Sequence, residues 1–202
     1  DMNNMNISLE GIRKAITPKT KAIVPVHLFG RAANMDAIME IANEHNLYVI
    51  EDNAQAIGAD YTNKDGVKKK VGTIGHVAAT SFFPSKNLGC YGDGGAIFTN
   101  DDNLAHIIRG IVNHGMYERY HHDVVGVNSR LDSIQAGVLK AKLPHLDTYN
   151  RARQDAARKY SLALGVNPNI VAPTICESCD CHVFHQYVIR ITNGKRDALL
   201  AH

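Results

Sequence analysis

Short apolar runs and amphipathic segments alternate along the first half of this chain. The apolar run 22–26 is followed by apolar positions at helical spacing over 35–46 and by a second apolar run over 47–50. Strand, helix and strand in this order form a βαβ unit, in which the two strands lie parallel. The pattern therefore predicts an α/β fold, with a mostly parallel sheet and helices on both of its faces.

The rest of the chain carries further strand-like and helix-like patterns. Strands are expected at 77–83, 95–99 and 186–191, and a surface turn or hairpin at 64–70. Helices are expected from Asp101 or Asp102 to Val112, over 131–142, over 146–164 and at the C-terminal end. Pro144 separates the second and third of these helices, and Gly165 ends the third.

These elements divide the chain into two parts at the start of a helix rich in arginine and alanine. Residues 1–145 are expected to form part of a large α/β domain. Residues 146–202 are expected to form a connecting helix and the start of a smaller, C-terminal α+β domain. The first residue is not a methionine and the last residues lie inside a helical pattern, so both ends are expected to be truncated.

The composition excludes several classes of protein. Of the 202 residues, 45% are hydrophobic and 21% charged, which is too apolar a chain to remain disordered. The 22 basic and 20 acidic residues leave a formal net charge of +2, with no broad field for nucleic acid or an anionic membrane. No apolar stretch is long enough to cross a membrane, and the polar N-terminus is not a signal peptide. Three of the four cysteines lie close together in the sequence, which does not suit a disulfide framework, so a cytoplasmic protein is expected.

Candidate chemistry lies just after the apolar runs, because ligands of α/β proteins bind beyond the carboxyl ends of parallel strands. Asp52 and Ala54 follow the run 47–50, where an acid beside a small residue leaves room for a flat ring with a positive nitrogen. Ser81 and Lys86 follow the next run. A lysine held among apolar residues can attack an aldehyde, and a serine hydroxyl can bind a phosphate. Taken singly, such an acid is more often a helix cap and such a lysine a surface residue.

Five segments, which follow one another along the chain, favour the functional interpretation of these residues. Segment 51–56 reads Glu-Asp-Asn-Ala-Gln-Ala, and segment 81–89 reads Ser-Phe-Phe-Pro-Ser-Lys-Asn-Leu-Gly. Together with 25–30, 92–96 and 126–132, they resemble the motifs of the DegT-type nucleotide-sugar aminotransferases over essentially the whole chain. These are pyridoxal-phosphate (PLP) enzymes with the aspartate-aminotransferase fold, so the resemblance implies a three-layer PLP-dependent transferase fold. Asn53 and Cys90 depart from that family's usual small residue and alanine.

The resemblance implies a role for each matching position. Lys86 would bond to PLP and then move protons as general acid and base, while Asp52 would pair with the protonated pyridine nitrogen. The other cofactor contacts implied are Ala54 on the ring face, Gln55 near the ring hydroxyl, Ser81 at the phosphate, and Asn128 at the phosphate from a second subunit. The substrate-facing or neighbouring positions implied are His27, Tyr91, Arg130 and His185.

The same resemblance implies a reaction and partners. It favours transfer of an amino group, with glutamate as the donor, to a keto group of a nucleotide-linked sugar in a homodimer with shared active sites. Some relatives are sugar dehydratases that carry histidine in place of the lysine, so Lys86 favours transamination over dehydration. A non-catalytic regulatory relative on the same fold is the other alternative, and the pair Lys86 and Asp52 argues against it.

A third hypothesis comes from a cluster near the C-terminal end. Its possible zinc ligands are Cys176, Cys179, Cys181, His182 and His185. One compact cluster with ligands so close in sequence is weak evidence, so no metal is expected. Two further groups, a phosphate site at 119–122 and a nucleic-acid patch at 68–70, are more simply a solvated loop and a solvated face.

Overall fold

The protein is described by a computed structural model covering residues 1–175 and 181–202. Its central sheet has the strand order β1-β2-β5-β6. The strands are β1 (Ala22–Ile23), β2 (Tyr48–Asp52), β5 (Val77–Ser81) and β6 (Gly95–Phe98). The first three are parallel, and β6 pairs antiparallel with β5. The prediction of a mostly parallel sheet is therefore confirmed.

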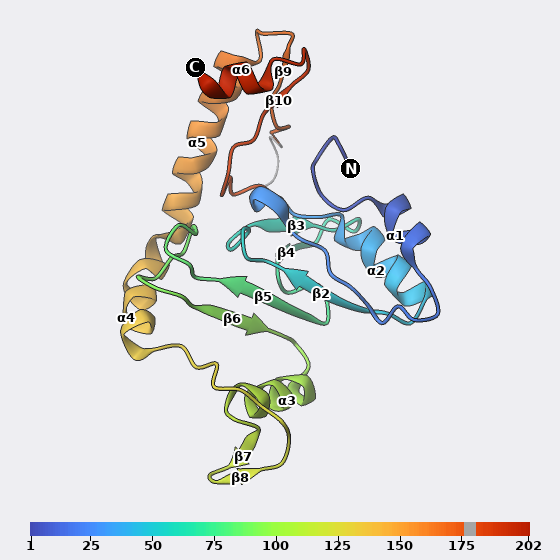
Figure 1. The fold of residues 1–202 in the computed structure, drawn as a ribbon, viewed down its shortest axis with the longest axis vertical. Helices are drawn as coiled ribbons and strands as arrows, with labels where there is room; N and C mark the ends of the chain where they lie inside the picture. The colour runs from blue at the N-terminus through green and yellow to red at the C-terminus, as the bar shows by residue number, and fades with distance from the viewer. Residues whose placement is uncertain (176–180) are drawn as a thin grey trace.

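Helix α2 (Met35–Glu44) makes the crossover between β1 and β2 and packs on one face of the sheet (Figure 1). Its N-cap is Asn34, whose side chain accepts a hydrogen bond from the Ala37 amide, and its apolar stripe is buried. Helix α1 (Leu9–Ala15), which the sequence pattern did not predict, packs on α2. The main apolar cluster joins the two helices to β1 and β2 through Ile12, Ile23, Met35, Ile38, Ile41 and Val49.

The two faces of the sheet differ because side chains alternate along a strand. On the α2 face, Val49, Glu51 and Ala78 are fully buried. On the opposite face, Tyr48 and Ile97 are exposed. One face therefore belongs to the core, and in this chain the other is open to solvent or to a ligand.

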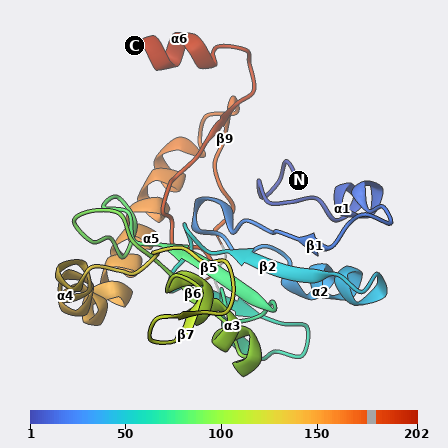
Figure 2. The ribbon, with the colours of Figure 1, turned by 60° about the horizontal axis from the view of Figure 1, so that its bottom comes forward.

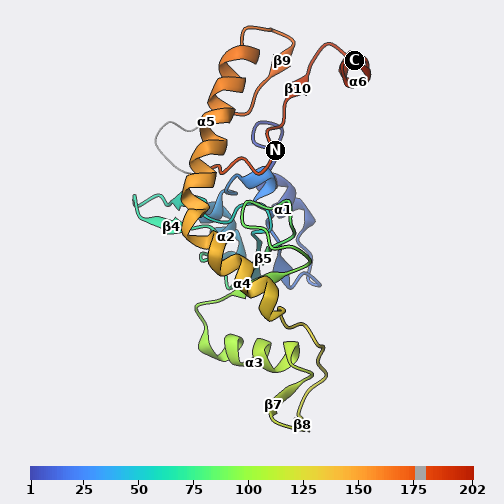
Figure 3. The ribbon, with the colours of Figure 1, turned by 90° about the vertical axis from the view of Figure 1, so that its left-hand side faces the viewer.

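The remaining elements surround this sheet. They are the hairpin β3 (Asp60–Thr62) and β4 (Lys68–Lys70), helix α3 (Asp102–Val112), the ribbon β7 (Met116–Glu118) and β8 (His121–His122), helices α4 (Ser133–Lys142) and α5 (Leu146–Leu164) joined by η2 (Leu143–His145), the pair β9 (Ile170–Val171) and β10 (Arg190–Ile191), and α6 (Arg196–Ala201). Figure 3 shows that α3 with its ribbon and β9, β10 and α6 lie at opposite ends of the molecule. Figure 2 shows α6 standing away from the sheet at the C-terminal end.

The predicted strand 186–191 is shorter than expected, since only Arg190–Ile191 forms a strand. The residues before it pair with the turn η1 (Leu28–Gly30) instead: the amides of Val183 and Gln186 donate to the carbonyls of Gly30 and Phe29. Gly30 has φ +97°, and a Cβ there would lie 2.9 Å from the His185 nitrogen. Only glycine leaves room for this close approach of two distant segments.

Candidate active site

Two adjacent carboxylates at the end of β2 face opposite sides of the sheet. Glu51 is fully buried on the α2 face, whereas the side chain of Asp52 is half-buried on the open face. The backbone of Asp52 is fixed by two hydrogen bonds, its amide to the Pro25 carbonyl at 2.9 Å and its carbonyl to the His27 amide at 3.0 Å. Strand pairing therefore holds the Asp52 carboxylate at the carboxyl end of the parallel strands, where ligands of such sheets bind.

The open face around Asp52 carries small side chains. Asp52 is paired in register with Ala79 of β5, and Ser81 lies two residues further on the same face. Ser81 is in turn paired with Gly95 of β6, where a Cβ would lie only 2.7 Å from the Thr80 carbonyl oxygen. An acid, an alanine, a serine and a glycine thus share one edge of the sheet, which leaves space for a flat ligand.

Lys86 follows this edge in a tight turn. Its amide donates to the Phe83 carbonyl at 2.9 Å, and Leu88 is buried on the far side of the turn in an apolar cluster with Phe82 of the strand end and Leu139 of α4. Gly89 packs so closely on the turn that a Cβ would lie 2.8 Å from the Phe83 carbonyl oxygen. The apolar anchors and the close-packed glycine fix where the lysine leaves the backbone.

The groups at this edge keep bonding capacity for a ligand. Asp52 accepts one hydrogen bond through Oδ1, from the Ala54 amide at 3.0 Å. Within the described residues, its Oδ2 and the Lys86 ammonium have no hydrogen-bond or ion-pair partner. Gln55 uses Oε1 to accept the Phe29 amide at 2.5 Å, which leaves its Nε2 to donate elsewhere. A carboxylate oxygen, an amine and small neighbours fit a flat ring with a protonated nitrogen and an aldehyde, which are the features of PLP.

The buried Glu51 carboxylate is held by four donors. Three are backbone amides of the turn before β5: Gly72 at 2.8 Å, Ile74 at 2.7 Å and Gly75 at 2.5 Å. The fourth is His27 Nε2 at 2.9 Å. Burial by itself would raise the pKa of Glu51, but the hydrogen bonds from His27, Gly75 and Gly72 outweigh it and hold the pKa below its ordinary value. The charged carboxylate therefore ties β1, β2 and the turn before β5 together beneath Asp52.

His27 was predicted either to face the substrate or to lie beside a substrate-facing group, and the structure places it inside the protein. The ring is fully buried. Its Nδ1 accepts the Ala33 amide at 3.1 Å, so Nε2 carries the proton that is donated to Glu51. Both nitrogens are used inside the protein, so His27 supports the strand end that carries Asp52 and cannot reach a ligand.

Helix α5 holds the segment that carries His185 against the lysine turn. Arg153 donates to the carbonyls of Phe184 and His185 at 3.2 and 3.3 Å, and Gln154 donates to the His182 carbonyl at 3.2 Å. Asn87, the residue after the lysine, donates to Asn150 Oδ1 of α5 at 2.7 Å and to the Val183 carbonyl. Neither Asn87 nor α5 was predicted to contribute, because the contacts join residues far apart in sequence.

The position of Asn87 also sets the state of His185. Since both protons of its amide nitrogen are donated, the Asn87 oxygen must accept, and His185 Nδ1 at 3.2 Å is the donor. Burial lowers the pKa of His185, and the charges of Lys86 and Arg153 lower it further. His185 is therefore a neutral ring near the lysine, with the lone pair of Nε2 left to accept a hydrogen bond.

A pH dependence of stability is expected from His182. Burial lowers the pKa of this ring from 6.5 to about 4, and the charge of Arg31 adds to the effect. Below pH 6.5 this histidine binds a proton in the unfolded chain but stays neutral in the folded chain. Its contribution to the unfolding free energy is therefore complete above pH 6.5 and is lost as the pH falls. The expected loss by pH 5 is about 2 kcal/mol.

The test compares urea unfolding of the full-length protein and its His182→Gln variant between pH 8 and pH 5. The difference in unfolding free energy between the two proteins should become smaller as the pH falls. The contribution of His185 is the same in both proteins and does not affect this difference. A difference that stays constant over this range would contradict the low pKa of His182.

Three other predicted residues are exposed in this chain. The Tyr91 side chain is exposed, and its backbone amide donates to Gln135 Oε1 at 2.7 Å. Asn128 and Arg130 are exposed and line a pocket that also includes Ala79 and Gly95 of this edge. The expectation for Asn128, that it acts across a subunit interface, concerns a second chain and stays a prediction.

The zinc hypothesis is not supported by the described residues. Cys176 and Cys179 lie outside residues 1–175 and 181–202, and within those ranges no three potential metal ligands are grouped together. The Nδ1 atoms of His182 and His185 already bind the Phe184 amide and Asn87, respectively. In the same ranges, no helix combines the length and the apolar character needed to cross a membrane.

Comparison with known proteins decides the family. Residues 1–202 match the model of the DegT/DnrJ/EryC1/StrS aminotransferase family. The chain belongs to this family. The family predicted from the five motifs is therefore confirmed, and the lysine turn and the acidic strand end described above are the structures formed by two of those motifs.

Members of the DegT/DnrJ/EryC1/StrS family with assigned names are similar over the whole chain. A protein of Geobacillus stearothermophilus named pleiotropic regulatory protein is 49% identical over 203 residues, which is 100% of this chain and 52% of that protein. The UDP-N-acetyl-3-dehydro-alpha-D-glucosamine 3-aminotransferase of Acidithiobacillus ferrooxidans is 48% identical over 193 residues, covering 96% of this chain and 50% of that enzyme. This chain therefore spans about half the length of the curated relatives it matches.

A solved structure confirms the fold. The crystal structure of DesV from S. venezuelae, in complex with a ketimine intermediate, superposes with a TM-score of 0.91 at 42% sequence identity. The match covers 100% of this chain and 52% of that one. The open sheet with its helices is thus one part of the aminotransferase fold, as the motifs predicted.

Proposed function

We propose that the protein containing this chain is a PLP-dependent aminotransferase that converts a keto group of a nucleotide-linked sugar to an amine. The observation that carries the proposal is the edge of the open sheet face. There Asp52 keeps a carboxylate oxygen without a partner among the described residues, Ser81 follows on the same face, and Lys86 has no ion pair. Relatives named as sugar aminotransferases at 44 to 48% identity support the same reaction.

Bound PLP would supply an electron-withdrawing ring that stabilises negative charge on a carbon next to the amino nitrogen. Asp52 Oδ2 is placed to accept a hydrogen bond from a protonated ring nitrogen, and its negative charge favours that protonation. Lys86 Nζ is the atom that would take the proton from the substrate carbon and return it to the carbon on the other side of the amino nitrogen. The Ser81 hydroxyl and the Gln55 Nε2 amide would orient the cofactor, and Ala79 would leave room for its ring.

The reaction partners follow from the same proposal. Glutamate is the proposed amino donor, and a nucleotide-linked keto sugar is the proposed acceptor. Asn128 is exposed in the single chain, which agrees with a role at a cofactor bound mainly by a second subunit of a homodimer. Arg130 and Tyr91 are exposed as well and remain proposed substrate contacts.

The experiment is chemical trapping of the lysine. The full-length protein is incubated with PLP, reduced with borohydride, digested and analysed by mass spectrometry. We expect the cofactor's mass to be added to the peptide that contains Lys86, and to be absent from that peptide in a Lys86→Ala variant. Labelling spread over surface lysines, with none on Lys86, would overturn the proposal.

A second candidate function is regulation by a protein of this fold. The 49% identity to a protein named for pleiotropic regulation favours it. The two candidates differ in turnover: a regulatory relative would bind its ligand without producing an amino sugar. Glutamate-dependent formation of the amine by the full-length protein would decide for the enzyme.

A further inference from the structure

A pocket lies outside the edge occupied by Asp52 and Lys86, at the junction of three segments. The N-terminal residues, the turn that contains Phe29, and the pair β9 and β10 form its walls. Its cavity volume is small, about 40 Å³, and the pocket opens to solvent. Because Phe29 and Gln186 line its inner side and Gln55 binds the Phe29 amide, the pocket adjoins the proposed active site without being part of it.

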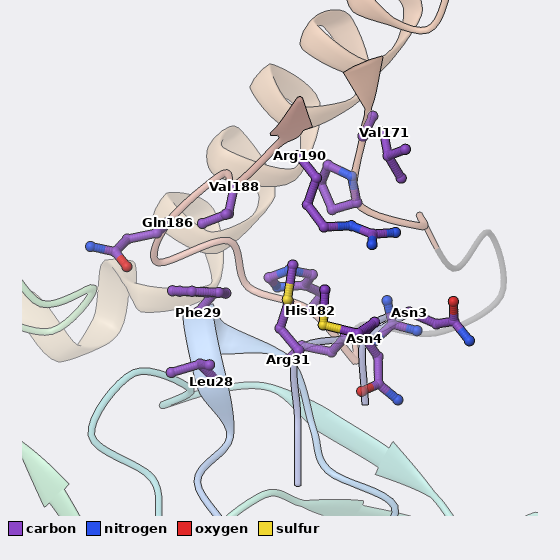
Figure 4. Close-up of a pocket in the computed structure, with 14 residues that line it drawn as sticks. Asn3, Asn4, Leu28, Phe29, Arg31, Val171, His182, Gln186, Val188 and Arg190 are labelled. Carbon is purple, nitrogen blue, oxygen red and sulfur yellow. The ribbon is translucent and has the colours of Figure 1, made fainter. Parts of the chain in front are cut away.

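Two arginines from distant parts of the sequence reach this pocket. Figure 4 shows Arg190 of β10 extending across the space beside His182, with Arg31 on the opposite wall. Arg31 donates to the Thr174 carbonyl at 3.3 Å. Across residues 1–175 and 181–202, Arg190 has neither a hydrogen bond nor an ion pair, and no carboxylate lines the pocket. Two guanidinium groups therefore line one pocket in which no described residue supplies a negative partner.

The other lining residues add donors and shape but no charge. Asn3, Asn4 and Gln186 present amide groups, and Leu28 and Val188 form apolar walls. His182 is neutral at physiological pH because burial and the charge of Arg31 lower its pKa to about 4. Among the described lining residues, the two arginines are the charged groups, so the charge that these residues supply is positive.

We propose that Arg31 and Arg190 form a binding site for a phosphate or diphosphate group, separate from the position of Ser81. A guanidinium group binds phosphate oxygens through two parallel hydrogen bonds, and two such groups suit a ligand with more than one negative charge. An anion in this pocket would relieve the repulsion between the arginines, which no carboxylate among the described lining residues offsets.

Calorimetric titration of the full-length protein loaded with PLP tests the site, because the cofactor then occupies its own phosphate position. The probe is inorganic diphosphate, and the variants are Arg31→Gln, Arg190→Gln and the double variant. Each single change is expected to raise Kd roughly tenfold and the double change roughly a hundredfold, as for lost charged hydrogen bonds. Arg158→Gln is the control, since it removes the same charge from an exposed arginine paired with Asp155.

A second titration, with uridine diphosphate, distinguishes a nucleotide-linked ligand from free phosphate groups. Tighter binding of the nucleotide that is still lost in the arginine variants indicates that the site takes a nucleotide-linked ligand, and equal binding indicates recognition of the phosphate groups alone. Arg190→Lys keeps the charge but loses the paired hydrogen bonds, so it should lie between wild type and Arg190→Gln. Kd values equal to that of Arg158→Gln in all arginine variants would overturn the proposal, whether or not the protein is an aminotransferase.

Discussion

Replacing Lys86 by alanine is expected to lower kcat for amino-group transfer by at least about a thousandfold, because one group both bonds to the cofactor and moves the proton. The structure offers no substitute. Asn87 is committed to Asn150 and Val183, and His185 is a neutral ring bound through Nδ1. The measurement is glutamate-dependent formation of the amino sugar by the full-length protein under saturating substrate.

The matched control for this variant is Lys140→Ala. Lys140 is exposed on α4, far in sequence from the lysine turn, so its removal should leave kcat unchanged. The Lys86→Ala protein should also unfold at the wild-type denaturant concentration, because the lost ammonium has no partner among the described residues. A Lys86→Ala protein that retains a tenth of the wild-type kcat would contradict the role proposed for this residue.

Replacing Glu51 by alanine is expected to lower the unfolding free energy by about 4 kcal/mol or more, or to prevent folding. The change would leave three buried or partly buried amides and the His27 ring without an acceptor, and it would open a cavity between β2 and the turn before β5. Denaturant unfolding of the full-length protein measures the loss. If the alanine variant does not fold, Glu51→Gln, which keeps the shape and one acceptor oxygen, should give a smaller, measurable loss.

Glu44→Ala provides the comparison on the same face of the molecule. Glu44 forms an exposed ion pair with Arg13 at 2.6 Å, and such pairs contribute only about 0 to 1 kcal/mol. Equal destabilisation by Glu44→Ala and Glu51→Ala would show that the four hydrogen bonds of the buried carboxylate do not hold the strand end.

Much of the fold could be predicted because its signals are local. The βαβ unit is encoded by two apolar runs and one amphipathic helix, and the helices after Asp101 and over 146–164 carry their own caps and breakers. The lysine turn could also be placed, since its motif is contiguous. The segment 186–191 was predicted too long because its pattern is apolar, while its backbone partner is a turn about 150 residues earlier.

The parts of the site that could not be predicted depend on contacts between distant segments. Glu51 and Asp52 are neighbours in one motif, and the sequence does not show that three amides of the turn at 72–75 donate hydrogen bonds to Glu51. The same pairing turned His27 from an expected substrate contact into a buried partner of Glu51. Arg31 and Arg190 carried no motif, and only the folded chain brings them to one pocket.

The two adjacent carboxylates also bear on how the strand itself is aligned. A shift of β2 by one residue would exchange every side chain between the two faces. It would move Asp52 toward the amides beneath the sheet and leave Glu51, with its longer side chain, on the open face. Charged residues as well as apolar ones thus fix the alignment of this strand, and a single inserted or deleted residue would misplace both the acid proposed to bind the cofactor and the buried structural acid.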